Sequence, residues 1–144
     1  IRDIKNATTG RVILIYQAIR TLAAAFSVRL GGHPQFVRPV VVPMAEGAAV
    51  ARYGEIHDKT SDTIRGASAA AENYGNFFAQ NCFMGASGTL LIVSTLVAQG
   101  IDVTALQIAT WSIPIAVISV LVGAWRDLTL DGKLAKMAKG GASK

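Results

Sequence analysis

The chain has 144 residues, of which 51% are hydrophobic and 16% are charged, and its formal net charge is +5. Soluble domains usually contain about 25% charged residues, so the composition argues against a soluble protein. The basic residues are not interleaved with aromatic ones as on base-stacking surfaces, which argues against a nucleic-acid partner. The single cysteine excludes an internal disulfide, and no histidine lies at metal-ligand spacing from it, so we expect no metal site.

Residues 11–51 form two apolar arms that a break separates. Thr8 or a neighbouring polar residue can cap a helix over about 11–28. Two glycines and two prolines exclude a regular helix over 30–39. A second helical piece is expected to start near Pro43.

Residues 52–72 are polar and lead into a row of small residues. Asp58 can cap a helix here, and Ala67, Ala71 and Gly75 are spaced four apart along it. Such a ladder lets two helices approach closely within a membrane. We expect an amphipathic cytoplasmic connection over 52–72.

Two long uncharged segments follow. No Asp, Glu, Lys or Arg occurs over 73–101 or over 103–125, and only a short turn around Gly100 and Asp102 separates the two. About 20 apolar residues cross the hydrocarbon core of a bilayer, so each segment is long enough to span it. Because polar residues crowd 72–81, we predict a broken transmembrane helix over 73–101 and a regular one over 103–125.

The distribution of charge predicts the topology. The segment 126–144 is basic, which predicts a cytoplasmic tail, and the turn at Gly100 should then face outward. Two crossings return 52–72 to the cytoplasmic side, so residues 11–51 must cross an even number of times or not at all. A re-entrant helical hairpin over 11–51 satisfies this count. The predicted fold is an all-α integral membrane protein with a re-entrant hairpin, a broken helix and transmembrane helices.

The two predicted breaks indicate a function. Non-helical backbone at membrane depth is tolerated only where protein buries it or where it lines an aqueous cavity. Gly31–Pro34 and the polar stretch 72–81 are two such places. Secondary transporters build substrate sites from two discontinuous helices, whose N-termini attract anions and whose unwound carbonyls hold a coupling cation. We therefore expect a transport site where the breaks meet.

Five segments carry distinctive motifs: Ala7–Arg11, Leu30–Pro39, Pro43–Ala49, Ala51–Glu55 and Asn73–Phe78. Together they resemble an uncharacterised bacterial membrane family that is described as one subunit of a two-subunit pyroglutamate (5-oxoproline) transporter in the ion transporter superfamily. The resemblance implies a second membrane subunit, coupling to a cation gradient and a multi-pass location in the bacterial inner membrane. The resemblance covers the family's C-terminal portion, and the chain begins at Ile1 without an initiator methionine. We therefore expect residues 1–144 to be a single membrane domain that lacks the family's N-terminal helices.

Arginine and histidine are the first candidates for binding an anionic substrate. The guanidinium of Arg38 can hold a carboxylate through two parallel hydrogen bonds, or it can lie at the interface and reach toward water. Arg20 can bind substrate, or it can pair with Glu46 or Glu72 as a structural bridge. His33 can donate to a carboxylate or carry a proton, or it can be a hydrated loop residue.

Amides and carboxylates complete the candidate site. The side chains of Asn73, Asn76 and Asn81 both donate and accept, which suits a lactam or a sodium ion, although they can equally satisfy the backbone of a broken helix. Glu46 and Glu72 are candidates for coupling a cation, or for capping at the interface. The predicted substrate-binding residues are Arg38, His33, Gly31, Gly32, Asn73, Asn76, Asn81 and Arg20.

An enzymatic alternative is weaker. Residues 85–88 fit the Gly-x-Ser-Gly pattern of rhomboid-type intramembrane proteases, but these enzymes need a later histidine as base, and none follows His57. We expect no enzyme and no bound cofactor, apart from a coupling Na⁺ or H⁺. The leading hypothesis is a secondary-transporter subunit for a small carboxylate, and the alternative is a non-transporting scaffold or regulatory subunit.

Overall fold

The computed structural model describes residues 7–28 and 30–141, and within these ranges the chain forms helices and no strand. The prediction of an all-helical fold is thereby confirmed, while residues 1–6, 29 and 142–144 lie outside the described part of the chain. The elements are α1 (Thr9–Ala25), the π-helical segment η2 (His33–Val41), α2 (Val42–Tyr53), α3 (Asp58–Phe77), the 3-10 turn η3 (Gln80–Cys82), α4 (Ser87–Ala98) and α5 (Ala105–Gly141).

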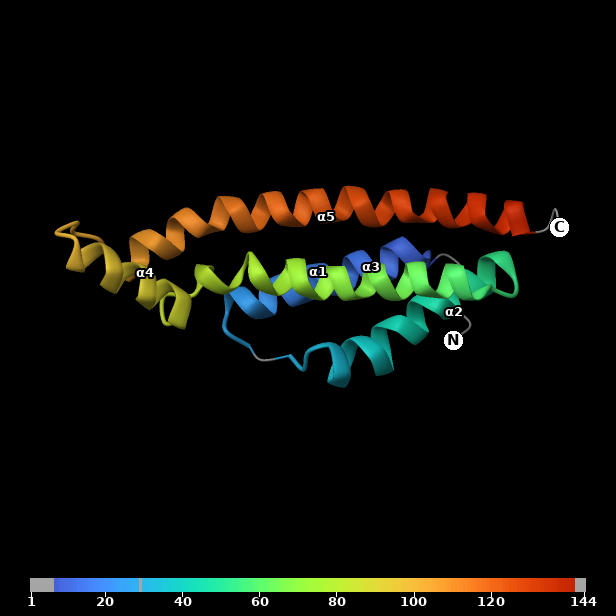
Figure 1. The fold of residues 1–144 in the computed structure, drawn as a ribbon, viewed down its shortest axis with the longest axis horizontal. Helices are drawn as coiled ribbons and strands as arrows, with labels where there is room; N and C mark the ends of the chain where they lie inside the picture. The colour runs from blue at the N-terminus through green and yellow to red at the C-terminus, as the bar shows by residue number, and fades with distance from the viewer. Residues whose placement is uncertain (1–6, 29, 142–144) are drawn as a thin grey trace.

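The helices form an elongated bundle. α1 and α3 lie side by side and run in the same direction, while α5 runs the opposite way along both (Figure 1). η2 and α2 lie across α1 and α3 from α5 (Figure 1). α4 extends beyond the end of α1 and packs against the first half of α5. A turn joins α4 to α5, and its Gly100 has a φ of 82°, a conformation that glycine adopts readily.

The break after α1 begins and ends earlier than expected, since α1 stops at Ala25 and the π-helical segment η2 already starts at His33. The side chain of Thr8 caps α1 by accepting from the Arg11 amide, and the helix ends at Ala25. Gly32 then precedes η2, which carries Pro39 in its interior. A proline lacks the amide hydrogen that a regular turn needs, and its ring collides with the carbonyl of the preceding turn. The wider π-type turn accommodates this clash.

Small residues bring α3 close to α1. The predicted ladder residues Ala67, Ala71 and Gly75 are all buried. A Cβ atom placed on Gly75 would lie 3.0 Å from the Cβ of Arg20, so a larger residue would push α1 and α3 apart by a few tenths of an ångström. The prediction of close helix packing at this ladder is confirmed. The main core surrounds it and contains Ile13, Tyr16, Val37, Val41, Val42, Ala45, Ala49, Ile64, Ala67, Ala71, Leu130 and Leu134.

α5 passes through the predicted boundary at residues 125 and 126 without a break. The basic segment is therefore the second half of this helix up to Gly141, instead of a separate tail. Leu130 and Leu134 from this half are buried in the main core, which explains why it stays helical against the bundle. Lys133, Lys136 and Lys139 project from it, exposed.

The bend after α3 falls later than the polar sequence suggested. α3 continues to Phe77, so Asn73 and Asn76 lie in regular helix, and the interruption covers 78–86. The helical pieces on either side of it, Asp58–Cys82 and Ser87–Ala98, are bent by 48°. Thr89, which is fully buried, compensates for the interruption by donating to two carbonyl oxygens in it.

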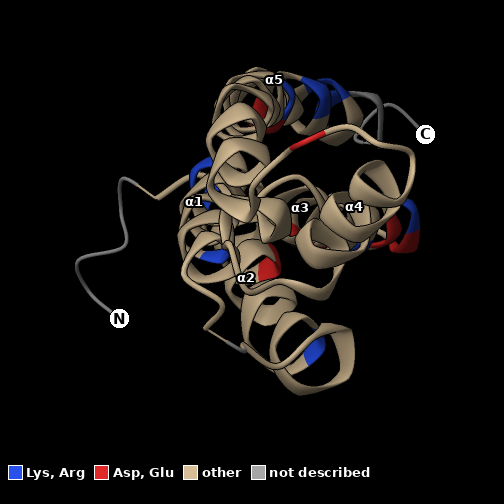
Figure 2. Ribbon diagram, turned by 90° about the vertical axis from the view of Figure 1, so that its left-hand side faces the viewer, with Lys and Arg blue, Asp and Glu red and all other residues tan. Residues whose placement is uncertain are grey.

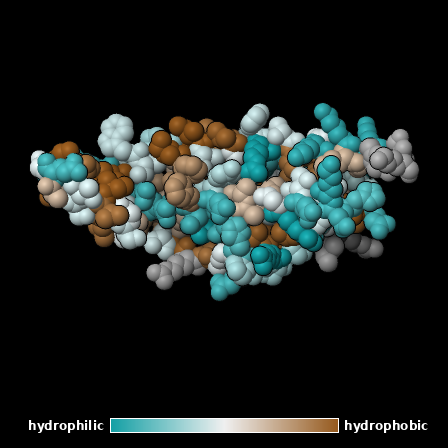
Figure 3. Space-filling view, viewed as in Figure 1, coloured by the Kyte–Doolittle hydropathy of each residue, from teal (hydrophilic) through white to brown (hydrophobic). Residues whose placement is uncertain are grey.

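Apolar and charged surfaces separate along the bundle. Within the described residues, Ala105–Lys139 is long and apolar enough to cross a bilayer, and the bent pair of helices forms a second such span if it is counted as one. Brown apolar surface is prominent over α4 and the first half of α5, while teal polar surface dominates the other end (Figure 3). α4 itself carries no charged residue and is tan throughout (Figure 2). The exposed large apolar side chains of this region are Leu90, Leu91, Ile92, Val97, Leu106, Trp111, Ile113, Ile115, Val117, Ile118, Leu121, Val122 and Trp125.

Candidate functional site

A buried ionic network joins α1 to α3. The Nε atom of Arg20 lies 2.9 Å from each carboxylate oxygen of Glu72, and its Nη2 donates to Asn76 Oδ1 at 2.8 Å. The hydroxyl of Tyr16 also donates to Glu72. Arg20 is 7% exposed and Glu72 is 4% exposed, so the ion pair is withdrawn from solvent. Such a pair holds the two helices in one register.

Helical spacing explains how the network assembles. Tyr16 and Arg20 are four residues apart on α1, and Glu72 and Asn76 are four apart on α3, so each pair lies on one helix face. Of the two pairings considered for Arg20, the structure contains the one with Glu72. Burial and the neighbouring carboxylate of Glu72 raise the pKa of the Tyr16 phenol. Tyr16 lies on α1, which is not among the helices long enough to span a bilayer. The phenol therefore stays protonated and donates.

The glycine-rich break lies against this network. His33 Nε2 lies 3.0 Å from Asn73 Oδ1, which connects the start of η2 to α3. A Cβ atom on Gly32 would lie 3.9 Å from Glu72 Oε1, and one on Gly31 would meet the side chain of Gln35. The segment around Gly31 and Gly32 and the polar residues of α3 are thus brought together.

A groove of about 700 Å³ opens between η2–α2 and α3. On one side Arg65 Nε lies 3.2 Å from Glu46 Oε1, and Ser61 also donates to this carboxylate. Arg38 forms no ion pair or hydrogen bond with any residue that the structure describes. The groove therefore carries one uncompensated positive charge. It is lined by His33, Val37, Arg38, Val42, Pro43, Glu46, Arg65, Gly66 and Ala69.

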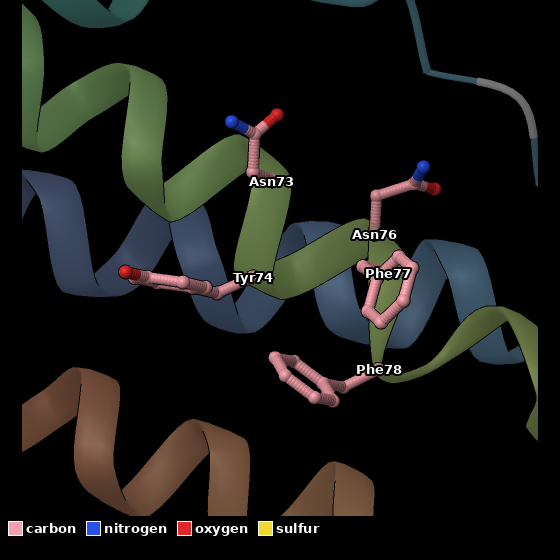
Figure 4. Close-up of a pocket in the computed structure, with 5 residues that line it drawn as sticks. All are labelled: Asn73, Tyr74, Asn76, Phe77 and Phe78. Carbon is pink, nitrogen blue, oxygen red and sulfur yellow. The ribbon is translucent and has the colours of Figure 1, made fainter.

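A smaller notch of about 330 Å³ lies further along α3. Asn73 and Asn76 project from the same side of the helix, and Phe78 lies on the side toward α5 (Figure 4). Tyr74 and Phe77 complete the lining. The notch thus presents amide groups on one side and aromatic rings on the other.

Asn81 does not join the other candidate residues. It lies in η3, where its Oδ1 is buried without a hydrogen-bond partner, and a Cβ atom on Gly88 would lie 2.7 Å from this oxygen. Because α3 continues as regular helix to Phe77, Asn81 is carried past the network. It belongs to the bend between α3 and α4.

Three buried polar residues were not foreseen from the sequence. Tyr16 belongs to the ionic network, Gln17 contacts α5 at Gly123, and Asp127 is 2% exposed. The spacing of four between Tyr16 and Arg20 would have indicated the first. Asp127 precedes the buried Leu130 by three residues, which is the spacing of residues on the core face of a helix. The lysines of this segment obscured that spacing because they favour a solvent-exposed tail.

The chemistry available to the site is therefore anion binding by cationic and amide groups. Among the residues that the structure describes, no group of three or more His, Cys, Asp or Glu side chains could hold a metal ion.

Comparison with curated proteins and with solved structures gives no match. Residues 1–135 match the family described as "Protein of unknown function (DUF969)", and the chain belongs to that family.

Proposed function

We propose that this chain is an integral-membrane subunit of a secondary transporter that binds a small organic anion in the groove between η2–α2 and α3. The observation that carries the proposal is that Arg38, which has no hydrogen bond or ion pair among the described residues, lines that groove together with His33. The sequence resemblance described above favours pyroglutamate as the substrate and a second membrane subunit as the partner.

Membrane insertion is supported by length and exposure. The uncharged part of α5, 105–125, is about 32 Å long at about 1.5 Å per residue, and the hydrocarbon core of a bilayer is about 30 Å thick. Asp102 and Arg126 bracket this part, so charge appears only at its two ends. The exposed apolar patch on α4 and α5 is much larger than scattered surface residues would give, which favours lipid or a membrane partner as its surroundings.

The groove chemistry suits a small cyclic acid. A guanidinium forms charge-assisted, two-point hydrogen bonds to a carboxylate, which is the role of Arg38, and His33 lies in the same groove lining. Val37, Val42 and Ala69 offer apolar contact for ring methylenes. A volume of about 700 Å³ lies within the range of about 300–1,000 Å³ that is typical of small-molecule sites.

The transport cycle follows from the irregular backbone. η2 and the 48° bend between α3 and α4 are two interruptions on neighbouring elements. Rigid-body movement of these elements against the second subunit would expose the groove alternately to the two sides of the bacterial inner membrane. A cation gradient would drive the cycle, with the basic half of α5 on the cytoplasmic side.

Uptake of labelled pyroglutamate into proteoliposomes that contain both subunits tests this function. Losing a charge-assisted hydrogen bond costs about 1.5–3 kcal/mol, so Arg38→Ala should weaken the apparent substrate affinity by about tenfold to 100-fold. Arg52→Ala, an exposed arginine at the end of α2, is the matched control and should leave uptake unchanged.

Three results would contradict the proposal. Uptake by the Arg38→Ala variant with unchanged affinity would remove the groove from the mechanism. Absence of any substrate binding or uptake by the wild-type pair would favour the scaffold alternative. A chain that stays in the aqueous fraction without detergent would contradict membrane insertion itself.

A further inference from the structure

Asp127 is a buried carboxyl group without a partner. It is 2% exposed, and its Oδ2 atom has no hydrogen-bond partner within the described chain. On α5 it follows Gly123 by one turn and precedes Leu130, and all three positions are buried against the bundle. Its direction into the bundle is therefore set by helix packing.

The charged groups around Asp127 offset its burial only in part, through the neighbouring Arg126. The neighbouring Arg126 places its guanidinium over the Tyr74 ring, 5.4 Å from the ring centre. Asp131 accepts from the Gly10 amide at 2.9 Å. No ion pair or hydrogen bond joins the Asp127 side chain to the described residues. Among the titratable and charged groups on the elements packed against this part of α5, Asp62, Arg126 and Lys133 line the same groove as Asp127. Arg11 and Tyr16 on α1, Tyr53 on α2 and Asp131 on α5 are further such groups on these elements.

Asp127 borders a groove although its Oδ2 atom is shielded from solvent. A groove of about 520 Å³ between α3 and α5 is lined by Asp127 together with Asp62, Thr63, Arg126 and Lys133. An ionised carboxylate that is buried without a partner is strongly disfavoured, and the group binds a proton instead. Because the groove runs beside the shielded carboxyl group, a shift of the groove wall would let water deliver or accept the proton without unfolding.

The two carboxylates first considered for cation coupling are already occupied. Glu72 is held by Arg20 and Tyr16, and Glu46 is held by Arg65 and Ser61. Both carboxylates thus already have a cationic partner within the bundle.

We propose that Asp127 is the proton-binding site of this transporter, a role that rests on the proposed function. A proton from water binds Oδ2 and forms a neutral carboxyl group, and the same O–H bond breaks when the proton is released. No other reactant takes part. The neutral carboxyl group of Asp127 suits the conformation described here. Release of its proton accompanies a second conformation, in which the groove between α3 and α5 is rearranged.

Infrared spectroscopy of the purified chain measures protonation directly, without transport. Exposed aspartates titrate near about pH 3.9, so a carboxyl band that persists at least one pH unit above that value is the expected signature. Asp127→Asn should abolish the band. Asp62→Asn, whose side chain is 76% exposed in the same groove, should leave it unchanged. Persistence of the band in Asp127→Asn, or absence of such a band in the wild type, would overturn the proposal.

Transport supplies the second measurement. In proteoliposomes with the second subunit, Asp127→Asn should exchange labelled for unlabelled pyroglutamate but lose accumulation driven by a pH gradient. Accumulation at the wild-type level would overturn the proposal. If the asparagine variant does not fold, Asp127→Glu should keep the band and shift its titration midpoint, and an unshifted midpoint counts against Asp127. Failure of wild-type uptake with the infrared signature intact would contradict only the transport function.

Discussion

His33 Nε2 lies 3.0 Å from Asn73 Oδ1, across forty residues of sequence, and this contact joins the irregular helix η2 to the polar face of α3. When Nε2 carries the ring proton, it donates to the amide oxygen. We predict that His33→Ala and Asn73→Ala each destabilise the protein by about 0.5–1.5 kcal/mol, and that the double variant costs less than their sum. Thermal unfolding in detergent measures this coupling, and strictly additive effects would contradict the bond.

The Arg20–Glu72 pair should be far more important for stability. Breaking a buried ion pair by removing one partner typically costs about 3–5 kcal/mol because the remaining charge stays buried. Glu72→Gln should therefore lower the unfolding temperature strongly. The matched control is Glu46→Gln, because its partner Arg65 is 61% exposed, and exposed pairs contribute about 0–1 kcal/mol. Equal losses in the two variants would show that the inner pair is not buried in the folded protein.

Gly123 should not tolerate a side chain. A Cβ atom there would lie 2.0 Å from Gln17 Nε2, so Gly123→Ala forces the amide of Gln17 to move. We expect a loss of about 1–3 kcal/mol from overpacking. Gly132→Ala is the control on the same helix, because nothing lies within 4 Å of a Cβ atom there, and it should stabilise α5 by about 0.5–1 kcal/mol.

Shortening the obstructing side chain tests the cause of that clash. Gln17→Ala should restore much of the stability of Gly123→Ala, because it removes the atoms that the new methyl group meets. If Gln17→Ala gives no rescue, the close approach of α1 to α5 is not the source of the loss.

Thr89 should stabilise the bend between α3 and α4. Its hydroxyl lies 3.2 Å from the carbonyl oxygens of both Asn81 and Phe83, so Thr89→Val leaves these acceptors without that donor at a cost of about 1–3 kcal/mol. Thr95→Val is the control on α4, since this exposed hydroxyl donates only to Leu91 in its own helix. Chemical unfolding of the purified chain compares the two, and indistinguishable midpoints would contradict the role of Thr89.

Local chemistry made much of the fold predictable. The all-helical class, the Thr8 cap and the turn at Gly100 follow from capping and glycine preferences. The approach of α3 to α1 follows from the spacing of Ala67 and Gly75, which needs no knowledge of the partner helix.

Tertiary contacts decided what the sequence left open. The basic half of α5 looked like a tail because its lysines are exposed, yet Leu130 and Leu134 fix it in the core. The polar residues Asn73 and Asn76 suggested a break, but their side chains leave the backbone of α3 regular. In the candidate site, Arg20 and Glu72 were individually foreseen, while Tyr16 was not, although its spacing of four from Arg20 places both on one face of α1.

The orientation of α5 across a bilayer tests the central claim most directly. Cys82 is the only cysteine, so in a Cys82→Ser background Asp102→Cys and Lys136→Cys each carry one thiol. In intact cells, a membrane-impermeant maleimide should label Asp102→Cys from outside, and Lys136→Cys only after permeabilisation. Labelling of both positions from the same side, or recovery of the chain in the aqueous fraction, would contradict the account.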